Sequence, residues 1–143
     1  MQICAAHGSP EEIAGGMGEG VTGWLDISPD GKLLSYTFDQ YNPAGWKLAV
    51  NPAHGGSALR TFDVPGGTTR VRWSPTGTGL QYLVTQDGAT NVWEQTLKGG
   101  KPKQLTKFTS GRIFDFSWSS DSRRLLLTRG DVTSDVVLLN NLR

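Results

Sequence analysis

Glycines that could hold a phosphate group occur at Gly18, Gly20 and Gly23, which match the pattern G-x-G-x-x-G. A dinucleotide site needs this pattern between a strand and a helix, because the N-terminus of the helix then faces the pyrophosphate. Here the pattern leads directly into an expected strand at residues 24–28, and no helical periodicity follows it. We therefore expect a loop between structural repeats at this position, and no cofactor.

Residues that could bind a metal or catalyse a hydrolysis are few. The two histidines, His7 and His54, both lie in expected turns beside glycines, and the single cysteine, Cys4, is near His7 only in sequence. A zinc site needs three or four convergent ligands, and a serine nucleophile needs an adjacent base. The sequence has no Gly-x-Ser-x-Gly, and its serines fall at turn positions. It therefore predicts no metal site and no catalytic residue.

Positive charge is concentrated in one stretch that has no acidic residue between its members. Such a stretch could contact an acidic partner, but lysines on an outermost strand also prevent edge-to-edge pairing of sheets, and we favour this structural explanation. The stretch comprises Lys98, Lys101, Lys103, Lys107 and Arg112.

The tripeptide 129–131 reads Arg-Gly-Asp, the letters of a cell-adhesion signal. Gly-Asp is also ordinary turn chemistry. We therefore expect a hairpin there, between the second and third strands of a repeat, and no role in adhesion.

Three similar segments recur along the chain and define the elements that must position these side chains. Ser28, Ser74 and Ser119 each follow a stretch of alternating apolar and polar residues, at spacings of 46 and 45 residues. The first copy reads Ser-Pro-Asp-Gly, in which proline fixes φ and glycine takes the left-handed conformation that closes a turn. The third copy has Ser120 and Ser122 instead of proline and glycine, so we expect a weaker turn there.

Each repeat has the pattern of four short strands. The period-two alternation around each serine predicts two partly buried strands, and two more follow them in the repeat. Four strands in about 40–45 residues are typical of a propeller blade. We therefore predict an all-β fold, a β-propeller of four-stranded antiparallel blades with about three blades per chain. They are a partial blade over 1–17, blades over 22–64 and 68–108, and a three-stranded blade over 112–143.

Two sequence signatures resemble a known family. The Trp-Ser-Pro-x-Gly turn at 73–77 and the segment Gly-Gly-Lys-Pro-Lys-Gln-Leu-Thr at 99–106 resemble the TolB-like, or WD40-like, propeller repeat. Residues 104–137 resemble the C-terminal propeller of bacterial receptor-type serine/threonine protein kinases. The resemblance implies a segment of a larger bacterial protein that acts outside the cytoplasmic membrane. Any kinase or peptidase activity would lie in another part of that protein, since this sequence has no His-Arg-Asp or Asp-Phe-Gly motif.

Charge and hydropathy exclude two classes of function. Fourteen basic and thirteen acidic side chains give a net charge of +1, whereas a nucleic-acid binder needs a basic surplus. Apolar runs are far shorter than the roughly 20 residues of a membrane span, and the N-terminus lacks the pattern of a signal peptide. We expect neither nucleic-acid binding nor membrane insertion.

We expect a non-catalytic interaction or sensor module that binds a protein or another ligand through loops at one mouth of the ring. The alternatives are an oligomerising propeller fragment without a ligand, and a lyase or hydrolase that uses the channel. Three blades do not close a ring, so a homodimer that forms a six-bladed ring is favoured over a fragment that packs irregularly. The predicted contact residues are Gly18, Glu19, Gly20, Thr69, Arg70, Ser110 and Arg112.

Overall fold

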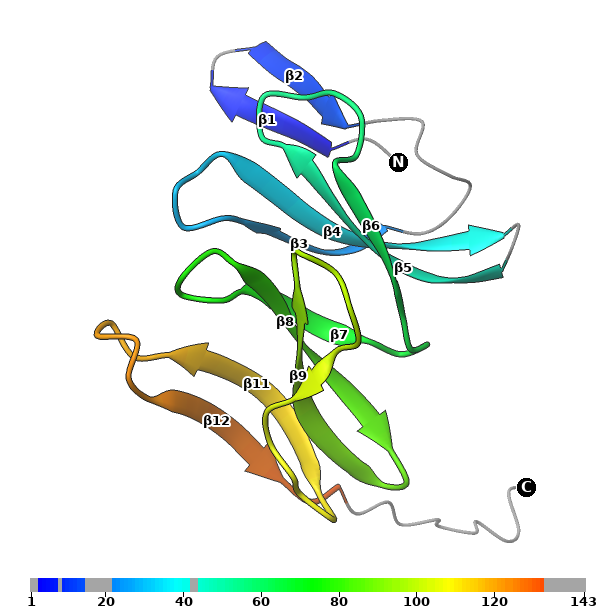
Figure 1. The fold of residues 1–143 in the computed structure, drawn as a ribbon, viewed down its shortest axis with the longest axis vertical. Helices are drawn as coiled ribbons and strands as arrows, with labels where there is room; N and C mark the ends of the chain where they lie inside the picture. Colours follow the sequence, from blue (N-terminus) through cyan, green and yellow to red (C-terminus); the bar gives the residue numbers. More distant parts are fainter. Residues whose placement is uncertain (1–2, 8, 15–21, 42–43, 133–143) are drawn as a thin grey trace, which may run out of the picture.

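The computed structural model describes residues 3–7, 9–14, 22–41 and 44–132, and side chains over 23–40 and 44–132. Within these ranges every regular element is a β-strand (Figure 1). The strands are β1 (Ile3–His7), β2 (Ser9–Ala14), β3 (Thr22–Ile27), β4 (Leu33–Tyr41), β5 (Ala44–Pro52), β6 (Arg60–Val64), β7 (Thr69–Trp73), β8 (Gly79–Gln86), β9 (Ala89–Thr96), β10 (Lys103–Gln104), β11 (Arg112–Trp118) and β12 (Leu125–Gly130).

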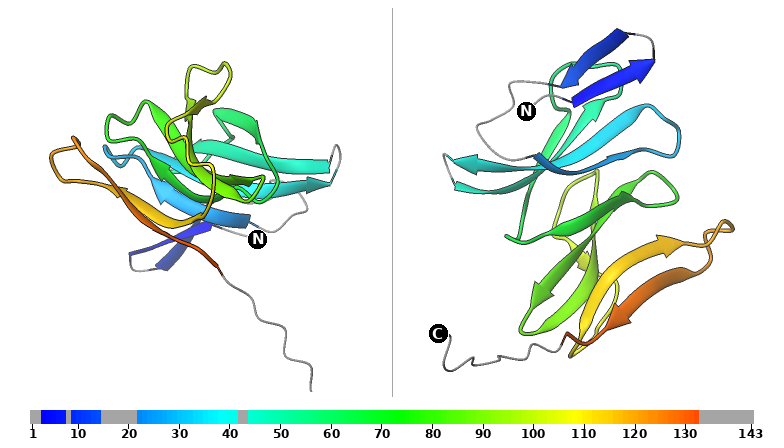
Figure 2. Two further views of the ribbon diagram at one scale, coloured as in Figure 1. Left: turned by 90° about the horizontal axis from the view of Figure 1, so that it is seen from below. Right: turned by 180° about the vertical axis from the view of Figure 1, so that it is seen from behind.

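The strands form antiparallel sheets in chain order. One four-stranded sheet has the order β3-β4-β5-β6 and the next has the order β7-β8-β9-β10, while β1-β2 and β11-β12 are two-stranded. The sheets follow one another along the long axis of the molecule, as both faces of the ribbon show (Figures 1 and 2). This arrangement confirms the predicted all-β propeller fold, of which these sheets form a part. The third strand of the last blade, which the sequence predicts at 135–139, lies outside the described residues.

The turn after the first strand of each repeat has the same hydrogen bonds in all three copies. The amide of Ser28 donates to the carbonyl of Leu33, and the amide of Ser119 donates to the carbonyl of Arg124; each hydrogen bond is 2.8 Å long. The third copy keeps this geometry without glycine, because Ser122 itself adopts a φ of 58°. The third turn therefore has the same geometry as the others, and its lower stability stays a prediction.

The last strand of the second sheet is shorter than expected. The sequence predicts a strand at 103–107, but β10 ends at Gln104. Beyond it the side chain of Asn91 replaces the strand ladder, because its Oδ1 accepts from the amide of Phe108 at 2.7 Å and its Nδ2 donates to the carbonyl of Phe108 at 3.0 Å. One buried amide side chain thus fixes the connection that leads to β11.

Apolar side chains fill the spaces between neighbouring sheets, as each propeller blade requires. A first cluster lies between the two four-stranded sheets and comprises Leu48, Val50, Val64, Val71, Trp73, Leu80, Tyr82 and Val84. Tryptophans at 24, 46 and 93 pack against this cluster, as expected for aromatic residues between blades. A second cluster, of Leu83, Val92, Ile113 and Phe116, joins the second four-stranded sheet to β11 and β12.

The first strands of successive sheets, β3, β7 and β11, each contain an irregularity in register. The shifts fall between Thr22 and Leu25, between Thr69 and Arg72, and between Ile113 and Asp115. Bulges of this kind bend a strand locally and redirect its side chains. The same irregularity therefore recurs near the start of the first strand in three successive repeats.

Candidate binding site between β7 and β11

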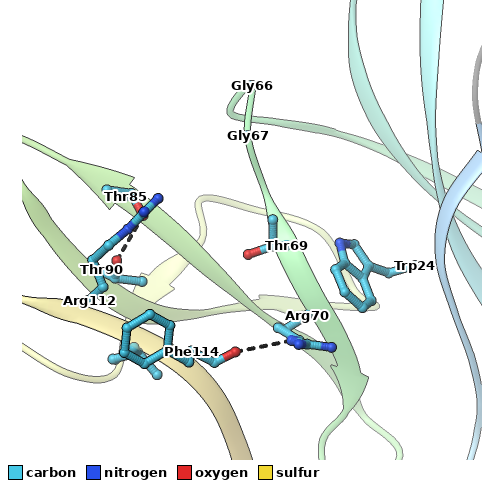
Figure 3. A pocket seen from close by; sticks show the side chains of 10 residues that line it. Trp24, Gly66, Gly67, Thr69, Arg70, Thr85, Thr90, Arg112 and Phe114 are labelled. Atoms are coloured by element: carbon cyan, nitrogen blue, oxygen red, sulfur yellow. Dashed lines mark hydrogen bonds between the residues drawn. The ribbon is translucent and has the colours of Figure 1, made fainter. Parts of the chain in front are cut away.

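A cavity of about 420 Å³ lies where β7 and β11 begin (Figure 3). The turn before β7, the start of β11 and the hairpin between β8 and β9 all contribute to it. Its lining is Trp24, Gly66, Gly67, Thr69, Arg70, Thr85, Thr90, Arg112, Ile113 and Phe114.

A tight turn sets the position of β7 at this cavity. The amide and the hydroxyl of Thr68 both donate to the carbonyl of Pro65, at 3.1 and 2.7 Å. Gly67 closes the turn with a φ of +80°, a conformation that a side chain would disfavour. The turn places Thr69 and Arg70 at the edge of the cavity.

Arg70 is held in an unusual conformation by contacts from two other strands. It has a φ of 53° within the irregular part of β7. Its Nε donates to the carbonyl of Phe114 at 3.1 Å, and its guanidinium carbon lies 4.5 Å from the ring centroid of Trp24. Figure 3 shows the guanidinium between these two partners. Its side chain remains 40% exposed, so Arg70 is fixed in place and still open to solvent.

The opposite side of the cavity is formed by hydroxyl groups and a second arginine. The hydroxyls of Thr85 and Thr90 are hydrogen-bonded to each other at 2.8 Å, and Arg112 extends beside Thr85 (Figure 3). The start of β11 is anchored there because the amide of Thr90 donates to the carbonyl of Gly111 at 3.0 Å. The lining therefore has two guanidinium groups and no carboxylate.

Asp115 is a carboxylate close to Arg70, although it is not part of the lining. Its Oδ1 lies 3.2 Å from Nη2 of Arg72 and 4.0 Å from Nε of Arg70. Partial burial acts to raise the pKa of Asp115, but hydrogen bonds from the amide of Phe116 and from Arg72 outweigh it and hold this pKa below its usual range. Asp115 is thus ionised at neutral pH and is shared between two arginines.

A second hollow of about 250 Å³ lies at the other end of the same strands, around Asp26, Arg72 and Trp118. Its charged groups already have partners within the protein. Asp26 accepts a hydrogen bond from the amide of Trp73 at 3.0 Å, and Arg72 pairs with Asp115. We therefore regard the cavity between β7 and β11 as the better candidate for a ligand.

The structure places three of the predicted contact residues, Thr69, Arg70 and Arg112, around one cavity. Ser110 does not line the cavity. Its carbonyl accepts a hydrogen bond from Arg129. Binding by any of these residues stays a prediction. The predicted residues Gly18, Glu19 and Gly20 lie outside the described residues.

Apart from the glycines at 66–67, which lie in an expected loop between repeats, sequence reasoning missed five residues of the lining, namely Trp24, Thr85, Thr90, Ile113 and Phe114. One signal was available, because Trp24 and Arg70 each precede the repeated serine by four residues. Residues at the same position of successive repeats lie on neighbouring inner strands. The repeat alone could therefore have predicted that Trp24 and Arg70 lie close together.

Two expectations about basic residues were wrong. Arg112 was grouped with lysines of an outermost strand, but it begins β11, an inner strand, whereas Lys103 lies in β10 at the sheet edge. Arg129 was expected in a hairpin turn, but it lies within β12. Its guanidinium stacks over the ring of Phe108 at 4.3 Å. Arg129 therefore helps to hold the connection between β10 and β11.

No group of three or more His, Cys, Asp or Glu side chains that could hold a metal ion occurs in the part of the chain that the structure describes, and His54 is exposed in its turn. No helix among the described residues could cross a membrane.

Comparison with known proteins gives the fold but no family, since no family model matches the chain. Dipeptidyl-peptidase 5 of Porphyromonas gingivalis is 31% identical over 106 residues, which are 70% of this chain and 15% of that protein. A TolB protein of Agrobacterium tumefaciens matches 86% of this chain and 43% of its own, with a TM-score of 0.65 and 24% identity. The β-propeller domain of the Trilobed protease of Pyrococcus furiosus matches 76% of this chain and 34% of its own, with a TM-score of 0.53 and 18% identity. The chain therefore has the fold of a segment of a TolB-like β-propeller.

Proposed function

We propose that this chain is a non-catalytic recognition segment of a larger bacterial protein, and that it binds polypeptide in the cavity between β7 and β11. The observation that carries the proposal is the position of Thr69, Arg70 and Arg112 around one cavity at the ends of inner strands. Binding residues often lie on such loops, because a rigid scaffold positions them. In the other charged hollow Asp26 and Arg72 are both hydrogen-bonded within the protein, whereas Arg70 of this cavity is 4.0 Å away from the shared carboxylate of Asp115, so this cavity is the better site.

The polypeptide ligand is supported by the comparison with a dipeptidyl-peptidase. The chain spans only 15% of that relative, so hydrolysis would belong to another part of the full protein. In such a protein the propeller segment would hold or select the peptide. Fold resemblance supports this only by analogy, and the cavity supplies the physical site.

A second candidate is a sensor module of a receptor-type kinase, for which the likeness of residues 104–137 is the support. In that case the same cavity would bind the signal outside the membrane. The two candidates differ in the parent protein and share the binding site.

A structural role through self-association is favoured by a separate observation. The apolar side chains Ile27 on β3 and Leu126 on β12 are 52% and 56% exposed, and sheet edges left unpaired at the ends of an open set of blades favour association. Two copies joined head to tail would cover them in a six-bladed ring. Light scattering would then give a mass of twice 15.5 kDa, whereas a monomer at all concentrations would rule the ring out.

The proposed function is tested by titrating the ¹⁵N-labelled chain with a mixture of hexapeptides of varied sequence and free termini. We expect amide shifts confined to residues 66–70, 85–90 and 111–114, and peptides that remain intact by mass spectrometry. No shift, or shifts confined to the lysines at 98–107, would contradict the proposed site. Cleavage by the chain that is lost when Arg70 and Arg112 are both replaced by glutamine would contradict a non-catalytic role.

A further inference from the structure

We infer that the cavity recognises the carboxylate of its peptide ligand, and that Arg70 is the residue that binds it. This inference rests on the proposed function and adds the chemical class of the group that is bound.

The backbone of Arg70 is the first observation. Three described residues other than glycine have a positive φ, and they are Arg70, Asp87 and Ser122. Asp87 and Ser122 lie in hairpin turns, where this conformation closes the turn. Arg70 instead lies within β7. A long side chain in this conformation is strained, and such strain persists where the surroundings over-determine it, commonly at binding sites.

The contacts of the guanidinium are the second observation. The ring of Trp24 covers one face at 4.5 Å, and the carbonyl of Phe114 takes the Nε hydrogen at 3.1 Å. Neither contact uses the terminal Nη groups. These two nitrogens form the fork that binds a carboxylate through two parallel hydrogen bonds. The cost of ordering an arginine has thus been met before a ligand arrives.

The charge of the lining is the third observation. Arg112 is a second cation, and the hydroxyls of Thr85 and Thr90 are neutral donors next to it (Figure 3). No carboxylate lines the cavity, and Asp115 is closer to Arg72 than to Arg70. The cavity is therefore short of negative charge, which the carboxylate of a ligand would supply.

The carboxylate could be the C-terminus of a peptide or the side chain of an acidic residue. Three probes separate the sources: acetyl-Ala-Ala-Phe with a free C-terminus, the same peptide as its C-terminal amide, and acetyl-Ala-Asp-Phe-amide. Each is titrated into the chain and its Kd is measured by calorimetry at low ionic strength, because salt screens exposed charges.

We expect the free acid, the aspartate peptide or both to bind at least tenfold more tightly than the neutral amide. Equal binding of all three would overturn the carboxylate but leave the proposed peptide site intact. Binding of none would overturn both proposals. In a competition experiment, inorganic phosphate and acetate are each added to the complex with the free-acid peptide. Displacement of the peptide by phosphate at lower concentrations than by acetate would indicate a phosphate site and would also overturn the inference.

Arg70→Gly isolates the guanidinium, because glycine adopts a positive φ without strain. We expect this variant to lose the preference for the acid over the amide, while Arg60→Gln, at an exposed arginine of β6, keeps it. A full preference in a folded Arg70→Gly would overturn the role of Arg70. Should that variant fail to fold, Arg70→Lys keeps the charge without the planar fork, and an unchanged preference in it would count equally against the inference.

Discussion

The amide of Trp73 donates a hydrogen bond to the carboxylate of Asp26, 3.0 Å away and 47 residues earlier in the chain. The bond joins β3 to β7, the inner strands of the two four-stranded sheets. The residue equivalent to Asp26 in the next repeat is Arg72, which pairs with Asp115 of the following inner strand at 3.2 Å. The same position thus links each blade to the next through a charged group, first as an acceptor and then as a donor.

Asp26→Ala should weaken the contact between the two sheets. The loss leaves the amide of Trp73, a residue only 6% exposed, without its partner. Hydrogen bonds to charged groups contribute about 1.5–3 kcal/mol, so we expect the free energy of unfolding in urea to fall by about 2 kcal/mol. Asp63→Ala removes the pairing with Lys47 at a carboxylate that is 87% exposed, and it should change stability much less. Equal losses in both variants would contradict a special role for the Asp26 bond.

Ser122→Gly should stabilise the third turn. Serine there has a φ of 58°, whereas glycine adopts a positive φ without steric cost. A gain of about 0.5–1 kcal/mol in thermal or urea unfolding is expected, reduced by the greater freedom of glycine in the unfolded chain. The reverse change at the equivalent position of the second repeat, Gly77→Ser, should destabilise, since its φ is +68°. A loss on Ser122→Gly would show that the turn is not strained.

Acid should destabilise the protein through its turn and inter-blade carboxylates. The hydroxyl of Ser28 and the amide of Lys32 lower the pKa of Asp30, and Ser119 and Arg123 do the same for Asp121. A carboxyl whose pKa is lowered by folding stabilises the protein above its unfolded pKa of about 3.9. This stabilisation is lost as pH falls from that value through the lower folded pKa.

Ser28→Ala should therefore raise the pKa of Asp30 toward its ordinary value, as read from its ¹³Cγ shift. Asp121 in the same sample serves as the control and should titrate as before. A pKa of Asp30 that does not move would show that the hydroxyl of Ser28 is not responsible.

Asn91→Ala should loosen the connection between β10 and β11. It removes the two bonds to Phe108 and a third from the hydroxyl of Thr106 at 2.9 Å. Because buried polar groups lose their partners, we expect a loss of about 2–4 kcal/mol in urea unfolding. Amide hydrogens near Gly111 should also exchange faster, and unchanged exchange would contradict this role for Asn91.

The features that could be predicted from sequence are those set by neighbouring residues. Local propensities determine the turns at Ser28, Ser74 and Ser119 and the alternation around them. The strands and the propeller fold could therefore be predicted from these turns and this alternation. The early end of β10 depends on the side chain of Asn91, which lies in another strand. No pattern within residues 103–107 could indicate that replacement.

The cavity was partly predictable for the same reason. Loops between repeats are recognisable from their glycines, and this placed Thr69, Arg70 and Arg112 at the site. The stacking of Arg70 on Trp24 joins two repeats across space. The bulge that gives Arg70 its left-handed backbone depends on the pairing of β7 with β8, which the local sequence does not reveal.

The most direct test is to observe the Nε–H resonance of Arg70 by ¹⁵N NMR while acetyl-Ala-Ala-Phe is added, with Arg70→Lys used to assign the signal. If the cavity binds a peptide through its carboxylate, this resonance will shift and saturate together with the amides of Thr69 and Phe114, while the Nε–H of Arg60 stays in place. A resonance of Arg70 that remains unmoved while the peptide binds elsewhere, or that moves no more than that of Arg60, would contradict the binding site between β7 and β11.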